Sequence, residues 1–415
     1  MTHGTQTGSH RTPPMSGTSL LWPLVLTTSL FFIWGLSYGL LEVLNKHFQD
    51  VFDITKARST LLQTAYFGAY ATVVWPAGRL LEKIGYKYTI LVGLAIYAAG
   101  AFMFIPSATT ASFNFFVASI FILATGLVCV ETAASPYVTL LGPSKNADRR
   151  IAIAQSVFGL GTFAGPLIGG MMFFADQEPT GGDLSSVVAT YGAIGAAVIV
   201  FAVIYGLAPL PKAAVLTEDE APQFGAPTTG LMGYRHFKWA VFAQWLNIGA
   251  QVGIGTLFIN FVTENWSGIE TSKAAYLLSV AMGLFLAGRI VSTAMLGKVS
   301  TNVVLTCFAV WNVLLLAIAV ADIPTVSTIA LMGTLFGCGG TYPLIFALGL
   351  RGLGENRKRG AAALVFGVSG GAVVPLVMGV VADAGSTSDA YFVALACYLF
   401  VSLFGWKLYK PTAED

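Results

Sequence analysis

Long apolar stretches alternate with short polar ones along almost the whole chain. Twelve of these stretches are long enough to cross roughly 30 Å of hydrocarbon as α-helices, and they are too long and unbroken for barrel strands. Every backbone polar group in lipid needs an internal partner, which a helix supplies. We therefore predict twelve transmembrane helices, at approximately 22–48, 59–81, 88–107, 112–141, 151–175, 187–208, 237–263, 273–297, 302–320, 325–352, 360–382 and 388–408.

Polar segments divide the chain into two groups of six predicted helices. Residues 1–20 are rich in Ser, Thr, Gly and Pro, which is typical of a disordered tail. The segment 209–236 is the longest polar interruption further along. The predicted organisation is a tail at 1–20, a six-helix half at 21–208, a linker at 209–236, a second half at 237–409 and a tail at 410–415.

Short motifs recur between the two halves at a nearly constant offset. Ala-Gly-Arg at 77–79 returns at 287–289, a shift of 210 residues. Two further sets return with shifts of 207 and 209 residues: Pro136, Gly142 and Arg150 as Pro343, Gly349 and Arg357, and Pro166-Leu167 as Pro375-Leu376. Three helix pairs in one register indicate a parallel repeat, an architecture in which transporters bind substrate between the halves.

Composition agrees with a protein that faces lipid. Hydrophobic residues make up 55% of the chain and charged residues 10%, with a mean hydropathy of +0.74, whereas soluble domains carry about 25% charged residues. The net charge of +2 gives no reason to expect nucleic acid as a partner. The four cysteines are widely spaced in apolar stretches, and the sequence contains no nucleotide-binding loop or catalytic constellation. We therefore expect no metal, no cofactor and no enzymatic activity.

The positive charges predict the orientation in the membrane. Lys and Arg gather on the cytoplasmic side of membrane proteins. With both termini inside, most of the 22 Lys and Arg residues lie on the cytoplasmic side, and only Lys46, Lys56, Arg58 and Lys273 lie outside. We therefore predict a multi-pass protein of the plasma (inner) membrane with both termini cytoplasmic.

Two acidic residues lie deep inside predicted helices, Glu42 in the first and Glu131 in the fourth. A charged carboxylate at the bilayer centre costs on the order of 2.5–3.5 kcal/mol, so such residues are usually functional. One reading is a pair of structural acids at helix junctions. The other is a pair of protonatable groups that take a proton from one side and release it to the other.

Arg289 is the one Lys or Arg residue assigned to neither membrane face, and two roles are open for it. It could be the counter-ion of one of the two acids. Its repeat partner Arg79 stands at the cytoplasmic end of the second helix, which instead favours a gate or a structural role for both arginines.

Neutral polar residues inside the helices suggest a sugar site. Amides and phenols bond hydroxyl groups, and aromatic rings pack on the apolar face of a sugar. The alternative for each residue is a hydrogen bond that joins two helices. The candidates for sugar contact are Gln63, Gln155, Asn247, Gln251, Tyr342, Trp34 and Tyr38.

Two longer motifs, one in a loop and one in a helix, resemble signatures of known transporters. "AGRLLEKIGYKY", which starts at Ala77, is similar to a cytoplasmic loop signature of facilitators, whose glycines permit a tight turn. "GLGTFAGPLIGG" in the fifth helix resembles a motif associated with proton-coupled antiporters. Small residues at this spacing also simply allow helices to approach closely.

Several segments together resemble the fucose permease branch of the major facilitators. They are "FFIWGLSYGLLEVLNKHFQ", "GLVCVETAASPYVTLLGP", "RIAIAQ", "FKWAVFAQWLNIGAQ" and "YPLIFALGL", within a likeness that spans about residues 28 to 405. The resemblance implies an all-α major facilitator fold with two pseudo-symmetric halves. It also implies symport of a monosaccharide with protons, in which Glu131 carries the proton and Glu42 couples protonation to sugar binding. The resemblance further implies that the sugar site includes Gln155, Gln244, Gln251 and Tyr342.

The chain departs from the fucose permeases at several positions near the expected site. Glu42 replaces their aspartate, and Phe158 replaces an asparagine of their fifth helix. Just before the acid they carry asparagines, where this chain has Tyr38, Gly39 and Leu41. Fucose, glucose, galactose, mannose and N-acetylglucosamine all stay open as substrates. A facilitative sugar uniporter and a proton-coupled drug antiporter are the alternatives to a symporter, and we expect a monomer in the lipid bilayer.

Overall fold

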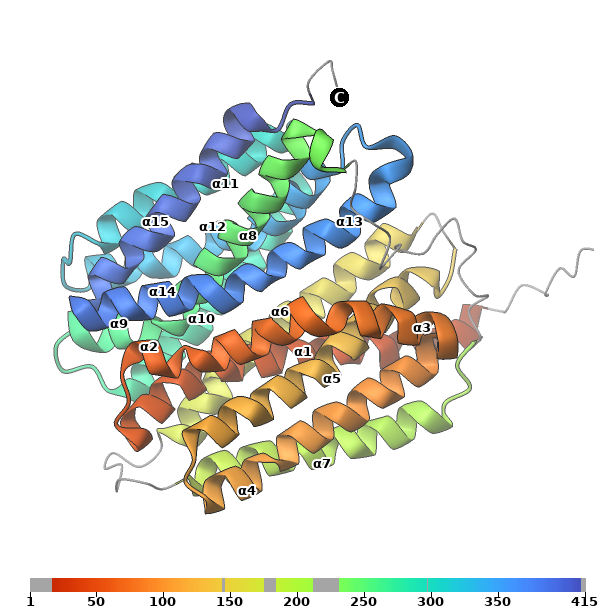
Figure 1. The fold of residues 1–415 in the computed structure, drawn as a ribbon, viewed down its shortest axis with the longest axis horizontal. Coiled ribbons are helices and arrows are strands. Elements are labelled where there is room, and N and C mark those ends of the chain that lie inside the picture. Colours follow the sequence, from red (N-terminus) through yellow and green to blue (C-terminus); the bar gives the residue numbers. More distant parts are fainter. Residues whose placement is uncertain (1–16, 144–145, 175–183, 212–230, 297, 412–415) are drawn as a thin grey trace, which may run out of the picture.

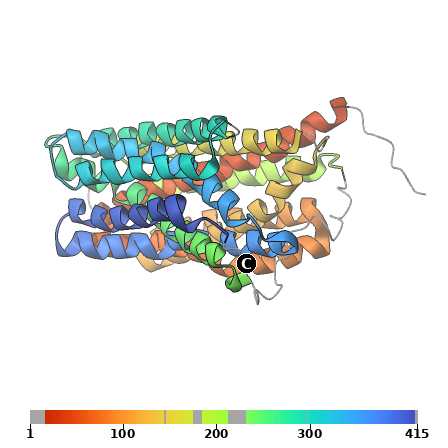
Figure 2. The same cartoon turned by 90° about the horizontal axis from the view of Figure 1, so that it is seen from above.

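The described part of the chain is a bundle of long helices that run in roughly the same direction (Figures 1 and 2). The computed structural model describes residues 17–143, 146–174, 184–211, 231–296 and 298–411. Its α-helices are α1 (Gly17–Phe52), α2 (Lys56–Ser59), α3 (Leu61–Phe102), α4 (Phe104–Thr109), α5 (Phe113–Leu140), α6 (Ala147–Phe173), α7 (Ser185–Leu207), α8 (Arg235–Thr256), α9 (Phe258–Asn265), α10 (Thr271–Met295), α11 (Thr301–Ala319), α12 (Val326–Gly349), α13 (Arg357–Phe366), α14 (Gly370–Ala384) and α15 (Thr387–Leu403).

Twelve membrane crossings can be traced through these helices. Ten helical stretches of the described residues are long and apolar enough to span a membrane, and the bent pair α8–α9 makes an eleventh. The stretch from Lys56 to Thr109 is 54 residues long, which at 1.5 Å per residue is about 80 Å and far more than one crossing needs. It breaks at Gly85, whose φ of 76° only glycine adopts easily, so α3 contains two crossings. The predicted count of twelve helices is confirmed.

Two of the crossings are interrupted within the bundle. α8 and α9 meet at an angle of 48°. α13 and α14 are joined by a short 3-10 turn at Gly367–Ser369. The apolar pattern predicts a single helix for each of these crossings and marks neither break.

The helices form two groups, α1–α7 and α8–α15, that correspond to the predicted halves (Figure 1). In the first group α1 packs along α6, and in the second α8 packs along α14, the corresponding pair of the repeat. Of the predicted linker, residues 212–230 lie outside the described residues, as do residues 1–16 and 412–415 of the two tails.

Glycines allow α1 and α6 to lie backbone against backbone. A Cβ atom added at Gly165 would stand 2.6 Å from the Cα of Gly39, and one added at Gly39 would stand 2.7 Å from the carbonyl oxygen of Thr162. A Cβ at Gly161 would likewise meet the backbone at Phe32 and Leu36. The glycine-rich motif of the fifth crossing therefore serves close helix packing in this chain.

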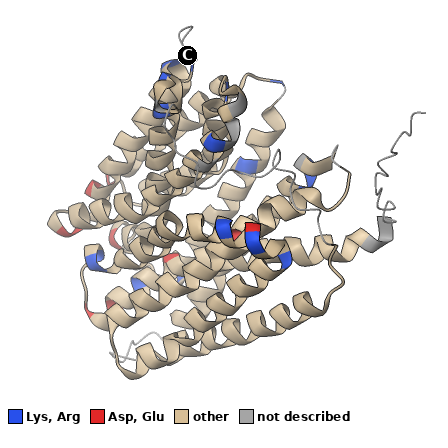
Figure 3. Ribbon diagram, turned by 45° about the vertical axis from the view of Figure 1, so that its right-hand side comes forward, with Lys and Arg blue, Asp and Glu red and all other residues tan. Residues whose placement is uncertain are grey.

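Polar contacts join the two halves at the end of the bundle that carries α2 and α9. We call this the outer end, after its predicted orientation. The Lys56 ammonium forms an ion pair with Glu264 at 2.6 Å, and the backbone N–H groups of Lys56 and Ala57 each donate to the Asp383 carboxylate at 2.9 Å. Most Lys and Arg residues gather toward the opposite end, as Figure 3 shows. The outer end is therefore closed in this structure.

Candidate functional site

Glu42 is completely buried at the contact between the two halves. Its Oε2 atom accepts a hydrogen bond from the Thr256 hydroxyl of α8 at 2.8 Å and one from the Gln63 amide of α3 at 3.4 Å. Its Oε1 atom is buried and has no hydrogen-bond partner among the described residues. The acid of the first crossing thus bonds the seventh crossing directly, through Thr256, which no sequence pattern marks as its partner.

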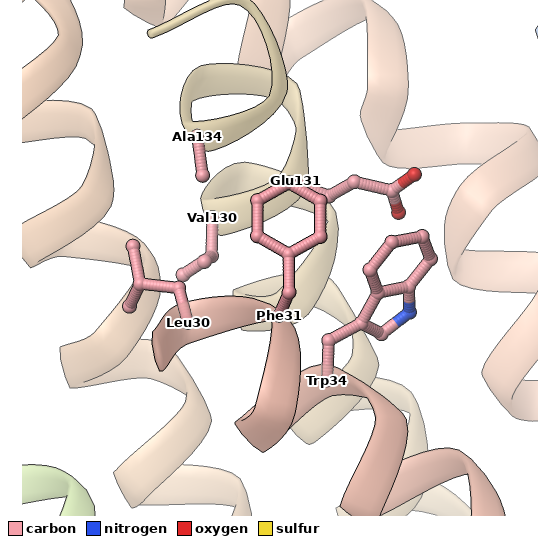
Figure 4. A pocket seen from close by; sticks show the side chains of 6 residues that line it. All are labelled: Leu30, Phe31, Trp34, Val130, Glu131 and Ala134. Carbon is pink, nitrogen blue, oxygen red and sulfur yellow. The ribbon is translucent and has the colours of Figure 1, made fainter. Parts of the chain in front are cut away.

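Glu131 lies at a pocket between α1 and α5 (Figure 4). The pocket is lined by Leu30, Phe31, Trp34, Val130, Glu131 and Ala134. The carboxyl group projects beside the Trp34 indole, and the phenols of Tyr66, Tyr70 and Tyr342 lie close enough to interact with it electrostatically. Its Oε2 atom is buried without a hydrogen-bond partner in the described structure. An acid in such surroundings can hold a proton.

One face of α1 connects the surroundings of the two acids. Trp34, Tyr38 and Glu42 are spaced four residues apart, so their side chains follow one stripe of the helix over about 12 Å. Tyr38 is buried between them, and its ring lies 6.2 Å from Phe67 and 6.5 Å from Phe158, centroid to centroid. Glu42 is the last residue of this stripe, and Glu131 of α5 lies beside Trp34 at its other end.

Amide side chains of α8 face the same region and are left unbonded. Both side-chain polar atoms of Gln244 and of Asn247, and the Oε1 atom of Gln251, are buried without a hydrogen-bond partner in the described structure. Tyr38 lies beside Gln251 without a hydrogen bond of normal geometry. A buried polar atom left without a partner costs about 1–3 kcal/mol, so such a cluster favours a ligand that brings its own donors and acceptors.

Arg289 lies between the halves rather than beside an acid. Its Nη1 atom donates to the Gln155 amide oxygen at 2.9 Å, and its guanidinium stands 5.8 Å from the centroid of the Phe158 ring. Among the described residues no ion pair joins it to a carboxylate. Its repeat partner Arg79 is exposed, so the two arginines occupy different environments.

The candidate sugar residues fall into two groups. Gln251 of α8 lies beside Tyr38, which follows Trp34 on the stripe of α1. Gln244 and Asn247 lie on the same face of α8 as Gln251, seven and four residues before it. The polar groups of the others already have contacts: the Gln155 oxygen is held by Arg289, and Gln63 bonds Glu42 and Asn45. Tyr342 lies near Gln244 and Arg289.

Comparisons with known proteins identify relatives over nearly the whole chain. A family model described as the Major Facilitator Superfamily matches residues 23–375. The glucose/galactose transporter of Brucella abortus is 30% identical over 404 residues, which cover 97% of this chain and 96% of that one. The L-fucose-proton symporter of Escherichia coli is 31% identical, and the match covers 93% of each chain.

Solved structures give the same result at the level of the fold. A crystal structure of a facilitator named FucP, in the outward conformation, superimposes with a TM-score of 0.70 at 31% identity. The match covers 95% of this chain and all of that one. A bacterial homologue of the lysosomal transporter Spinster, in an inward-facing conformation, has a TM-score of 0.72 at 15% identity over 97% and 99% of the two chains, which is a likeness of fold alone.

Proposed function

Because the chain belongs to the Major Facilitator Superfamily, and within it to the fucose permease-like branch, we propose that it imports a monosaccharide together with protons by alternating access. The relatives are named for fucose and for glucose or galactose, so a hexose or a deoxyhexose is the substrate class. One observation carries the proposal: the buried Glu42 and the half-buried Glu131 lie at the two ends of an aromatic stripe of α1, beside amides of α8 whose polar atoms have no hydrogen-bond partner in the described structure.

In this proposal the acids carry the coupling and the amides hold the sugar. Glu131 binds the proton that enters with the sugar, and Glu42 links protonation to closure around it. Asn247, Gln251 and Gln244 bond the sugar hydroxyls, while Trp34 and Tyr38 pack on its ring. Gln155 and Tyr342 border the site beside Arg289, which acts as a bridge between the halves.

The charge distribution supports the orientation in the proposal. We infer a monomer in the inner membrane with both termini cytoplasmic. Its halves comprise residues 21–208 and 237–409, joined by a cytoplasmic linker at 209–236. No catalytic step is needed, because the membrane potential supplies about 2.3 kcal/mol per charge per 100 mV.

The experiment is uptake and proton flux in proteoliposomes. Purified protein should accumulate one of L-fucose, glucose, galactose, mannose and N-acetylglucosamine against its gradient when the outside is acidic, and adding that sugar should alkalinise the outside. Saturable uptake without accumulation or proton movement would favour a facilitative uniporter. Proton movement evoked only by apolar cations would favour the drug antiporter.

Sugar contact can be tested by binding. Gln251→Ala should weaken binding by about 1–3 kcal/mol, because a sugar hydroxyl then loses its partner inside the protein. Asn312→Ala is the matched control, since that buried amide bonds Cys338 within the second half. Equal sugar affinities of the wild type and Gln251→Ala would show that the sugar binds elsewhere.

A further inference from the structure

A continuous file of buried carboxamides runs from Glu42 to the outer end of the bundle. The Asn260 amide donates to Gln49 Oε1 at 2.6 Å, and the Gln49 amide donates to Asn45 Oδ1 at 2.7 Å. The Asn45 amide donates to Gln63 Oε1 at 3.1 Å, and the Gln63 amide donates to Glu42 Oε2 at 3.4 Å. All five side chains are buried.

From Gln49 to Glu42 the links point the same way, because Gln49, Asn45 and Gln63 each donate toward the acid. Gln49 and Asn260 exchange two hydrogen bonds, since the Gln49 amide also donates to Asn260 Oδ1 at 3.3 Å. An amide can hold both roles only in one orientation, so turning Gln63 would deprive Asn45 of its acceptor. The orientation of each amide therefore depends on the next, and the carboxyl group at the end sets the direction of the whole file.

The far end of the file joins the two halves. Gln49 belongs to α1 and Asn260 to α9. The Ser59 hydroxyl of α2 accepts a hydrogen bond from the Gln49 amide at 2.9 Å and donates one to Asn45 Oδ1 at 3.1 Å. The ion pair between Lys56 and Glu264 lies at this same closed end. A change at Glu42 therefore has a direct hydrogen-bonded route to the contact that closes the outer side.

The closed arrangement suits a neutral Glu42 better than a charged one. Oε2 has its two donors, but Oε1 is buried with no partner among the described residues. A negative charge there would be left uncompensated, whereas a proton on Oε1 removes the charge and can be donated to the neighbouring Tyr38 hydroxyl. Ionisation strengthens the hydrogen bonds that Oε2 accepts but leaves a buried charge beside an unpartnered oxygen, so the ionised acid favours an arrangement in which water reaches it.

We propose that Asn45, Gln49, Gln63 and Asn260 are positioning residues that form a latch on the outer side of the transporter. The latch is intact while Glu42 carries a proton and releases when Glu42 ionises. Loss of the proton to the inside then allows the empty protein to open outward again. The inference rests on the proposed role of Glu42 as a proton-binding group, and it gives Gln63 to the latch rather than to the sugar.

Other titratable groups near the latch are few and can be separated from Glu42. Tyr38 of α1 and Tyr391 of α15 interact with the Glu42 carboxylate. His47 is on α1 as well, but its ring packs on Phe173 and Phe174 of α6. Glu264, Asp383 and Lys56 lie beyond the file at the outer end.

The test measures how far the outer side is open, without sugar, as pH changes. A single cysteine replaces Ala372, which is buried on α14 where Thr64 of the other half bonds its carbonyl oxygen. The four native cysteines are replaced, and a membrane-impermeant maleimide is added to right-side-out vesicles. Rates are divided at each pH by those of a Ser267→Cys reporter, which is exposed in the loop after α9, to remove the effect of pH on the thiol.

In the otherwise unchanged protein, labelling of the Ala372→Cys reporter should rise several-fold from acid to alkaline pH. Glu42→Gln, which stays neutral, should label slowly throughout. Gln49→Leu and Asn260→Leu should label fast at every pH, and the exchange Gln49→Asn with Asn260→Gln should restore part of the pH dependence. Glu264→Gln is the matched control: it removes a bond between the halves outside the file, so labelling should rise while the pH dependence stays.

Several results would overturn the latch. These are a normal pH dependence in Gln49→Leu or Asn260→Leu, a normal pH dependence in Glu42→Gln, or its loss in Glu264→Gln. If Gln49→Leu and Asn260→Leu do not fold, the exchanged pair must still show pH-dependent labelling for the latch to stand. Labelling that follows these expectations in a protein without sugar-evoked proton flux would support the latch and contradict the symport proposal.

Discussion

At the scale of single residues, the two acids inside the membrane-spanning helices differ in what surrounds them. Glu42 is enclosed by hydrogen-bond donors and lies on the contact between the halves, whereas Glu131 borders a pocket with aromatic neighbours. A change in the charge of Glu42 acts directly on α3 and α8, the helices that it bonds. The acid at the pocket is suited to exchanging a proton with water.

Glu131→Gln should abolish proton-coupled accumulation while sugar binding persists. Glutamine keeps the size and polarity of a protonated acid but releases no proton. The measurement is sugar-evoked pH change in proteoliposomes, with sugar exchange across the membrane in the absence of a gradient as the control for a folded, binding-competent protein. Wild-type proton flux in the variant would assign proton carriage to another group.

Uptake by the wild type should fall as external pH rises, because the protonated acids are the form that binds sugar and closes. Glu42→Asp keeps a carboxyl group but withdraws it by one methylene from Thr256 and Gln63. It should retain proton-coupled uptake with a changed KM, whereas Glu42→Ala should lose coupling. The measurement is uptake against external pH for all three proteins. A flat profile in the wild type would contradict proton coupling.

The sequence identified both acids because charge inside an apolar helix is visible without a structure. Asn45 and Gln49 carry a similar signal, since they continue the face of Glu42 at three and seven residues further on. Thr256, which bonds Glu42, and Asn260, which bonds Gln49, lie about 210 residues further along the chain. No local pattern pairs either of them with α1. The roles of all these residues stay predictions.

At the scale of helices, the sequence predicts the crossings well and their breaks poorly. Helix length and apolar content follow from the thickness of a membrane, so the twelve crossings can be read directly. The turn at Gly85 was predicted by its loop motif and is confirmed by the positive φ. The bend between α8 and α9 depends on packing against other helices, which the order of residues in one helix does not reveal.

The close packing of α1 on α6 makes a prediction about stability. Gly165→Val should destabilise the protein by about 1–3 kcal/mol or more, because the added atoms would overlap the backbone of Gly39. Gly192→Val in α7 is the matched control, since a Cβ atom there meets nothing within 4 Å. Thermal unfolding in detergent compares the two variants. Equal melting temperatures would show that α6 can move away without cost.

At the scale of the whole molecule, the outer end is closed by bonds that cross between the halves. They include the ion pair of Lys56 with Glu264, the bonds of α2 to Asp383, and the pair Gln49–Asn260. Alternating access requires these bonds to break and reform in each cycle. Holding them closed by a covalent bond should therefore stop transport even though every site residue is intact.

A disulfide across the outer end tests this requirement. A Cβ atom at Gly379 of α14 would lie 2.7 Å from the Cα of Ala57 of α2, which is closer than a disulfide requires, so the two helices must move slightly apart before cysteines at the two positions can bridge. In a background without the native cysteines, the oxidised Ala57→Cys, Gly379→Cys variant should lose sugar uptake and regain it on reduction.

The matched control places a disulfide at the same end but inside one half. Ser107 of α4 and Ser119 of α5 have hydroxyl oxygens 3.0 Å apart, so Ser107→Cys with Ser119→Cys gives a comparable bridge. Each half moves as a unit when access alternates, and this bridge should therefore leave uptake unchanged in both redox states. Full transport by the oxidised Ala57→Cys, Gly379→Cys variant, with the bridge verified, would show that the outer end need not open. Equal losses in both variants would indicate damage by oxidation rather than a locked gate.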